Sequence, residues 1–122
     1  MALLPHPPSF ILVVEDEALV RDCTVAQLED DGFEVIGAGD VEEALRAFHG
    51  HAGLTTVFTD VNMPGPHDGL YLAHTIHALR PDVRVIVTTG RGVLPASALP
   101  EGGRFLPKPY RYDELNALIR AA

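Results

Sequence analysis

The sequence predicts an α/β protein built on a parallel sheet whose two faces are covered by helices. From Phe10 onward, short apolar runs alternate along the chain with longer segments of helical period. Strict alternation of this kind is typical of parallel sheets with crossover helices. The first run, Phe10-Ile-Leu-Val-Val14, is also rich in β-branched residues and free of polar interruptions, as expected of a strand that is buried on both sides.

Length and composition favour one globular domain. The chain has 122 residues, of which 47% are hydrophobic and 21% charged. This size is typical of a single domain, and this balance excludes an intrinsically disordered protein. Residues 1–9 contain three prolines, so we expect a flexible N-terminal tail there and the folded domain over residues 10–122.

The charge excludes several classes of partner. The formal net charge is −8, which has the wrong sign for direct binding of nucleic-acid phosphates or anionic lipid. No apolar run is long enough to span a bilayer. The single cysteine, Cys23, cannot form an intramolecular disulfide, and this favours a reducing, cytoplasmic environment.

The apolar runs are expected to form five strands, over residues 10–14, 33–36, 54–58, 83–87 and 104–106. Helices are expected between them, over residues 18–30, from about residue 41, and over 69–79 and 112–121. The second helix has the clearest signals, because Asp40 is a typical cap and Glu43 follows three residues later. Val41, Ala44 and Phe48 then recur at helical spacing.

Two helices are less well defined. In the first, the apolar residues Leu19, Val20, Cys23 and Ala26 are expected to lie on one side, with Cys23 buried as a small hydrophobe. Between residues 91 and 103, two prolines and several glycines restrict the fourth helix to a short, irregular piece near residues 95–99.

Polar residues follow four of the five predicted strands: Glu15, Asp16 and Glu17 after the first, Asp60 after the third, Thr88 and Thr89 after the fourth, and Lys108 after the fifth. In open parallel sheets, ligands bind outside the carboxyl ends of the strands. The second strand is the exception and is followed by Gly37-Ala-Gly39. We therefore expect one polar crevice at this edge.

The chemistry of these side chains indicates a site for a phosphoryl group. Carboxylates from two strand ends repel one another unless a cation lies between them. Oxygen ligands with retained water favour Mg²⁺, and Lys108 supplies a second positive charge. A carboxylate nucleophile, two cations and a threonine hydroxyl are the groups that phosphoryl transfer needs.

Four motifs in the expected order resemble the receiver domain of two-component response regulators: VVEDE at 13–17, FTDVNMP at 58–64 with Asp68-Gly69, VTTG at 87–90 and FLPKP at 105–109. The resemblance covers residues 10–120. It implies a CheY-like, flavodoxin-like, doubly wound sheet with strand order 2-1-3-4-5.

The resemblance also implies roles for individual residues. Asp60 matches the aspartate that accepts a phosphoryl group from a phosphohistidine, and Lys108 matches the lysine that pairs with the phosphoryl oxygens. Mg²⁺ would be held by Glu15, Asp16, Asp60 and the backbone carbonyl of Asn62.

Further positions match the switch residues of the family. Thr88 matches the hydroxyl residue that turns toward the phosphoryl group, and Phe105 matches the switch aromatic. Thr88 and Thr89 point to opposite faces of a strand, and the family register favours Thr88. Thr89 then stands where relatives usually have a smaller residue. The Lys108–Pro109 peptide is expected to be cis.

The function implied is that of a phosphoacceptor in a two-component phosphorelay, with self-catalysed phosphotransfer and autodephosphorylation rather than turnover of small substrates. Its expected partners are a histidine kinase or a histidine phosphotransfer protein, and a downstream protein target, with the domain itself a monomer or weak dimer. Two alternatives stay open: a phosphorylation-independent adaptor with the same fold, and a receiver that is part of a longer hybrid histidine kinase or regulator.

Overall fold

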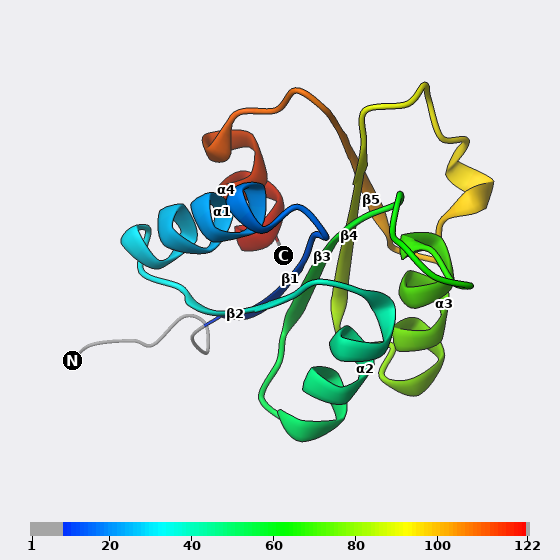
Figure 1. The fold of residues 1–122 in the computed structure, drawn as a ribbon, viewed down its shortest axis with the longest axis horizontal. Helices are drawn as coiled ribbons and strands as arrows, with labels where there is room; N and C mark the ends of the chain where they lie inside the picture. Colours follow the sequence, from blue (N-terminus) through cyan, green and yellow to red (C-terminus); the bar gives the residue numbers. More distant parts are fainter. Residues whose placement is uncertain (1–8, 122) are drawn as a thin grey trace.

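The computed structural model describes residues 9–121 as a five-stranded parallel sheet between two pairs of helices (Figure 1). The strands are β1 (Phe10–Val14), β2 (Glu34–Ala38), β3 (Thr56–Asp60), β4 (Arg84–Thr89) and β5 (Arg104–Pro107). The helices are α1 (Ala18–Asp30), α2 (Val41–Gly50), α3 (Gly69–Leu79) and α4 (Tyr112–Arg120), with a short 3₁₀ helix, η1 (Ala96–Ala98). The strand order is β2-β1-β3-β4-β5, which confirms the predicted fold class.

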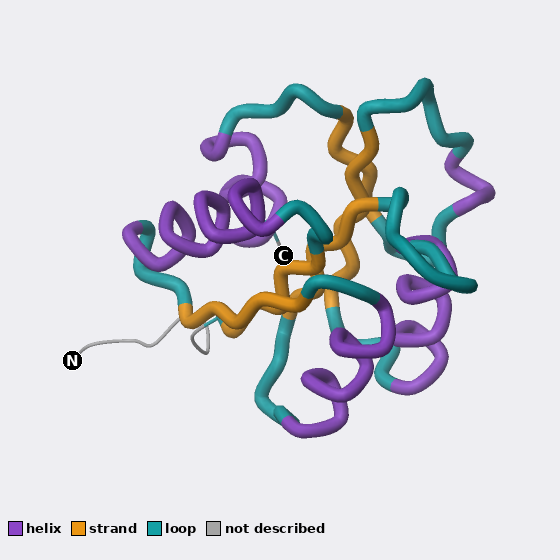
Figure 2. The backbone as a smooth tube through the Cα atoms, viewed as in Figure 1, coloured by secondary structure: helices purple, strands orange, loops and turns teal. Residues whose placement is uncertain are grey.

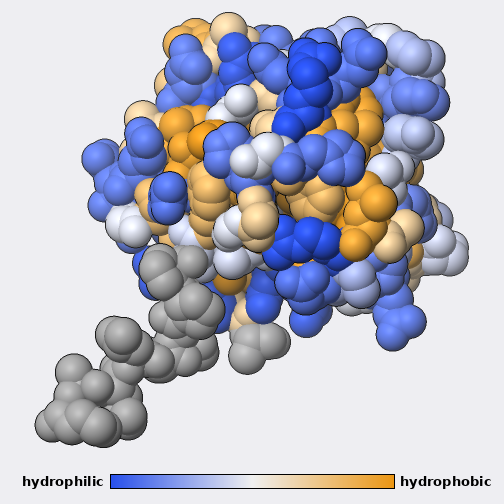
Figure 3. Space-filling view, turned by 90° about the horizontal axis from the view of Figure 1, so that it is seen from below, coloured by the Kyte–Doolittle hydropathy of each residue, from blue (hydrophilic) through white to orange (hydrophobic). Residues whose placement is uncertain are grey.

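The helices form two layers, with α1 and α4 on one face of the sheet and α2 and α3 on the other (Figures 1 and 2). Successive strand residues face opposite layers. Along β1, Ile11 and Val13 belong to the hydrophobic cluster that includes Leu28 of α1 and Leu115 of α4, whereas Leu12 and Val14 belong to the cluster under α2 and α3. Figure 3 shows one face, on which hydrophilic side chains separate the visible apolar patches.

The inward face of α1 differs from the prediction. Leu19 is 74% exposed and Cys23 is also exposed, whereas Thr24 and Leu28 are buried. Leu28 has a large apolar side chain and is completely inside. A helix oriented to bury Leu28 also buries the residue four positions earlier, and it turns the adjacent Cys23 away by about 100°. The weak apolar pattern of this helix could not reveal that orientation.

Four of the five strands, all except β1, extend further toward their carboxyl ends than their apolar runs predict. β3 continues through Asp60 and β4 through Thr89. Asp60 pairs with Thr88 in the register of these strands, and the amide of Val61 donates to the carbonyl of Thr88 at 2.9 Å. Asp60, Thr88 and Thr89 of the predicted crevice are therefore fixed by sheet pairing rather than carried on loops.

The region between β4 and β5 contains only the three-residue η1, close to the short helix expected at 95–99. No helix within residues 9–121 has the length and apolar character needed to cross a membrane. The predicted tail over residues 1–9 lies outside the described residues except for Ser9 and stays a prediction.

Candidate functional site

The site lies at the carboxyl edge of the sheet, where the ends of β1, β3, β4 and β5 are neighbours. Glu15 directly follows β1, Asp60 is the last residue of β3, and Lys108 directly follows β5. The strand order places β2 outside this group. Three distant parts of the sequence thus bring two carboxylates and an ammonium group to one place, as the strand-end rule predicts.

Lys108 joins the two carboxylates. Its Nζ lies 2.5 Å from Oδ2 of Asp60 and 3.4 Å from Oε1 of Glu15. The side chains of Asp60 and Glu15 are only 7% and 10% exposed, whereas that of Lys108 is 32% exposed. Burying two negative charges is by itself unfavourable. The ammonium group, which is the more exposed partner, therefore compensates both charges from the solvent side.

The pKa shifts reflect this arrangement. Burial raises the pKa of the Glu15 carboxyl above its ordinary value of 4.5, although the backbone amide of Glu17 and the charge of Lys108 act in the opposite direction. Burial lowers the pKa of Lys108, but the hydrogen bonds and charges of Asp60 and Glu15 together outweigh it, so that this pKa lies above the ordinary value of 10.5. Lys108 is accordingly a stable cation at neutral pH.

The second oxygen of Asp60 is held by the following loop. Oδ1 of Asp60 accepts a hydrogen bond from the amide of Asn62 at 2.9 Å. Gly69, the first residue of α3, approaches the backbone of Asp60 so closely that a Cβ there would lie 1.9 Å from the Asp60 carbonyl oxygen. The amide of Gly69 also donates to the carbonyl of Val61 at 2.9 Å. The loop is thus folded tightly over the end of β3.

The two threonines at the end of β4 have different surroundings. Thr88 is 2% exposed, and its hydroxyl oxygen has no hydrogen-bond partner among the described residues. The hydroxyl oxygen of Thr89 accepts from the side-chain amide of Asn62 at 3.0 Å and from the amide of Arg91 at 3.1 Å. Within residues 9–121 this hydroxyl donates to no acceptor, so its own proton is available for a further one. No sequence pattern indicates this link between Thr89 and Asn62.

Phe105, the predicted switch aromatic, lies on the last strand, and the cis peptide follows this strand directly. Phe105 is half-buried on β5 and pairs with Val87 of β4 in the sheet register. The Lys108–Pro109 peptide is cis, as the resemblance implies, and the amide of Lys108 donates to the carbonyl of Thr89 at 3.1 Å. This hydrogen bond places Lys108 beside the end of β4.

The donor set at this edge fits Mg²⁺ in its chemistry. Asp16 is exposed in the turn after β1, next to Glu15, and the carboxylate of Asp60 and the backbone of Asn62 lie at the end of β3. Within residues 9–121, no three His, Cys, Asp or Glu residues are arranged to enclose a metal by themselves. Mg²⁺ suits such a site because it is commonly bound by one or two carboxylates and retains several waters.

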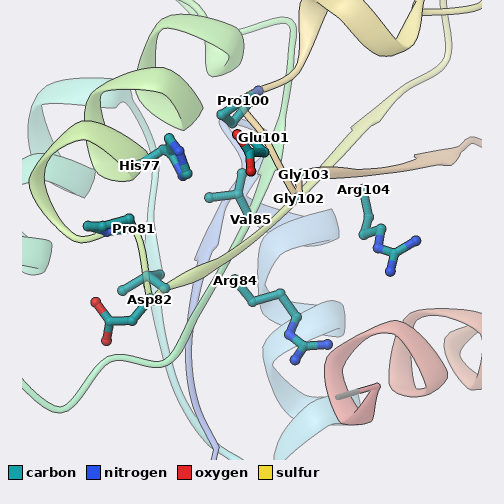
Figure 4. A pocket seen from close by; sticks show the side chains of 11 residues that line it. His77, Pro81, Asp82, Arg84, Val85, Pro100, Glu101, Gly102, Gly103 and Arg104 are labelled. Atoms are coloured by element: carbon teal, nitrogen blue, oxygen red, sulfur yellow. The ribbon is translucent and has the colours of Figure 1, made fainter.

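A separate hollow of about 270 Å³ lies at the opposite edge of the sheet, near the amino ends of β4 and β5 (Figure 4). His77 of α3 and the loop containing Pro100 and Glu101 border it, together with Arg84 and Arg104 at the strand starts. None of the predicted site residues lines this hollow.

The fold and the site define the class of protein to which the chain belongs. The chain is a doubly wound α/β protein with an acidic pair and a lysine at the carboxyl edge of its sheet. The sequence profile of the response regulator receiver domain matches residues 11–120. The chain therefore belongs to this family and is a receiver domain of two-component response regulators.

Its relatives include larger regulators. The chain is 34% identical over 115 residues to the transcriptional regulatory protein FixJ of Bradyrhizobium diazoefficiens, covering 92% of the chain and 55% of FixJ. It is also 34% identical over 115 residues to the DNA-binding transcriptional regulator NtrC of Azospirillum brasilense, covering 92% of the chain and 24% of NtrC. The chain thus spans about half of the first relative and a quarter of the second.

Solved structures of similar size share the fold. A response regulator receiver domain protein from Clostridium thermocellum is 33% identical, with a TM-score of 0.84 and coverage of 91% of this chain and 90% of that one. The response regulator TrrA of Thermotoga maritima, solved in complex with Mg²⁺ and BeF, is 30% identical, with a TM-score of 0.78 and coverage of 92% and 96%.

Proposed function

We propose that this receiver accepts a phosphoryl group on Asp60 from the phosphohistidine of a histidine kinase or phosphotransfer protein, and that the modification changes its contacts with a downstream protein. The observation that carries the proposal is the position of the Asp60 carboxylate. It is nearly buried at the carboxyl edge of the sheet, with Lys108 at one oxygen and the amide of Asn62 at the other.

The reaction is a displacement at phosphorus. An oxygen of the Asp60 carboxylate forms a bond to phosphorus while the bond between phosphorus and the imidazole nitrogen breaks, and the electron pair stays on the imidazole. Lys108 is already in contact with the acceptor carboxylate and is placed to neutralise a phosphoryl oxygen. Mg²⁺, held by Asp16, Asp60 and the Asn62 carbonyl with Glu15 beside them, would supply further positive charge.

The contacts support Thr89, rather than the predicted Thr88, as the source of the hydroxyl group. Thr89 bonds to the side chain of Asn62, whose amide bonds to Asp60, and it keeps a free proton. Gly90 then follows the hydroxyl residue, so the small residue that relatives carry at the next position is present. The hydroxyl of Thr88 is buried and makes no hydrogen bond to any described residue.

The setting is proposed to be the cytoplasm. Cys23 is free and exposed, as is usual in a reducing compartment. The net charge of −8 argues that the output of this domain is a protein contact rather than direct contact with nucleic acid.

A labelling experiment tests the proposal. The protein is incubated with acetyl phosphate, and incorporated phosphoryl groups are counted with and without Mg²⁺. We expect Mg²⁺-dependent labelling that disappears in Asp60→Asn. Asp68→Asn is the matched control, because Asp68 lies in the same loop and caps α3, a role that asparagine also fills. Unchanged labelling of Asp60→Asn would overturn the assignment.

A further inference from the structure

The glycines at the end of β2 accommodate an arginine from α1. A Cβ added at Gly37 would lie 3.2 Å from Cδ of Arg21, and one added at Gly39 would lie 3.1 Å from its Nη1. Neither glycine has a positive φ, so the backbone conformation does not require glycine at these positions. The absence of two side chains instead leaves the space in which the half-buried Arg21 side chain lies.

Arg21 reaches the acidic turn after β1 through this space. Its Nη1 donates to the backbone carbonyl of Glu15 at 2.9 Å. The other polar groups of Glu15 are also engaged: its amide donates to the carbonyl of Ala38 at 3.0 Å, and Oε2 accepts from the amide of Glu17 at 3.1 Å. Oε1 faces Nζ of Lys108. Arg21 therefore completes the set of contacts that hold Glu15.

The turn depends on such contacts because the start of α1 is otherwise weakly held. Glu17 is the N-cap residue, but its side chain makes no capping hydrogen bond. By contrast, α2 and α3 are capped by the carboxylates of Asp40 and Asp68. Asp16 lies within the turn 15–17, between the residue that Arg21 holds and the residue that begins the helix.

We propose that Arg21 is a positioning residue that fixes the turn 15–17 and thereby the Mg²⁺-binding position of Asp16 and the contact between Glu15 and Lys108. The proposal rests on the function proposed above, since it assigns a purpose to the turn as part of the Mg²⁺ site. Residues that orient metal ligands without touching the metal typically change metal affinity by roughly 10–100-fold when replaced.

The test measures the dissociation constant of Mg²⁺ by calorimetry on the unphosphorylated protein, so that it does not depend on phosphotransfer. We expect Arg21→Met, which keeps much of the apolar stem, to weaken Mg²⁺ binding by roughly 10-fold. Arg21→Lys keeps the charge but loses the planar donor group, and we expect a smaller loss of affinity.

A second variant displaces Arg21 without removing it. In Gly39→Ala the three atoms nearest the new Cβ belong to the ends of the long Arg21 and Glu43 side chains and not to the backbone, so the fold is expected to tolerate it. We expect Gly39→Ala to weaken Mg²⁺ binding in the wild-type background and to have no further effect when combined with Arg21→Met. Additive losses in the double variant would contradict the proposed route through Arg21.

Arg120→Met is the matched control. Arg120 also donates to a backbone carbonyl, that of Asp31 at 3.2 Å, but at the other end of α1. We expect this variant to lose stability in urea like Arg21→Met and to keep the Mg²⁺ affinity of the wild type.

The outcomes separate the two proposals. If the wild type is labelled on Asp60 and Arg21→Met binds Mg²⁺ as tightly as the wild type, the inference about Arg21 is wrong and the proposed function stands. If Arg120→Met weakens Mg²⁺ binding as much as Arg21→Met, the effect is one of general stability, which also overturns the inference. Failure of the proposed function would show separately, as labelling that persists in Asp60→Asn.

Discussion

At the scale of single residues, the negative charge of the unphosphorylated site is partly neutralised by a lysine of the chain itself. Lys108 contacts Asp60 at 2.5 Å and approaches Glu15 at 3.4 Å. A positive charge is thus present before any metal binds, although one ammonium group faces two carboxylates. The remaining negative charge, with Asp16 close by, explains physically why this edge would attract a divalent cation.

Replacing each of the two threonines of β4 by the isosteric valine is expected to have different effects on stability and on labelling. Thr88→Val removes a buried hydroxyl that has no hydrogen-bond partner among residues 9–121, so we expect unchanged or higher stability and near-normal labelling by acetyl phosphate. Thr89→Val removes the acceptor of the Asn62 and Arg91 bonds and the free hydroxyl donor, and we expect labelling to slow by roughly 100-fold. Urea unfolding and the rate of labelling by acetyl phosphate, measured for each variant, test both predictions. If Thr88→Val is the slow variant, the hydroxyl belongs to Thr88.

Tyr110 is expected to make the free energy of unfolding depend on pH in the alkaline range. Its ring packs edge-to-face with Phe58 at 5.6 Å, and burial raises its pKa above the ordinary value of 10.0. The unfolded chain therefore releases this proton at lower pH than the folded protein does. The contribution to stability is complete below pH 10 and declines as the pH rises toward the folded pKa.

Urea unfolding on both sides of pH 10 measures this effect. We expect Tyr110→Phe to lose less stability than the wild type as the pH rises, while the more exposed Tyr71 serves as the control in Tyr71→Phe. Equal pH dependence of Tyr110→Phe and the wild type would show that Tyr110 does not contribute.

At the scale of elements, the start of α3 is packed against the end of β3. An alanine Cβ at Gly69 would lie 1.9 Å from the carbonyl oxygen of Asp60, and since that atom is backbone, the strand or the helix has to move. We expect Gly69→Ala to lower the free energy of unfolding by roughly 1–3 kcal/mol, the usual cost of overpacking. We also expect slower labelling, because the displaced backbone carries Asp60.

Gly50→Ala is the control for this prediction. Gly50 is also a helical glycine, at the end of α2, but a Cβ there would meet nothing within 4 Å. Alanine is the better helix former, so we expect stability to be kept or raised. If Gly69→Ala were as stable as Gly50→Ala in urea, the close approach of α3 to β3 would be wrong.

The sequence predicted elements well where one physical signal dominated. α3 begins and ends at the predicted residues 69 and 79, and the predicted cap of α2 is present as a bond from the amide of Glu43 to Asp40. β3 and β4 were predicted too short, because their last residues are polar and are held by pairing with each other. Apolar patterns cannot report that pairing.

The site was predicted from the sequence as a set of residues but not as a set of contacts. The strand-end rule brought together Glu15, Asp60 and Lys108, which the structure places in contact. It could not tell which threonine hydroxyl bonds to Asn62, because that depends on how the loop after β3 folds. The rule also did not identify Arg21, because its proposed role depends on the space that Gly37 and Gly39 leave for its side chain.

At the scale of the whole molecule, the topology itself creates the site. Because every strand pair is parallel, all carboxyl ends meet at one edge, and part of the net charge of −8 is concentrated there. The opposite edge carries the hollow near Arg84 and Arg104 and none of the predicted site residues. The residues of the candidate site thus lie together at the edge formed by the carboxyl ends of the strands.

The measurement that tests the central claim most directly is the location of the phosphoryl group. The protein is treated with acetyl phosphate and Mg²⁺ and reduced with borohydride, which converts an aspartyl phosphate to homoserine, and its peptides are analysed by mass spectrometry. We predict homoserine at position 60, and none when Mg²⁺ is chelated. Homoserine at another aspartate, or a phosphoryl group on a serine, threonine or histidine with Asp60 unmodified, would contradict the account.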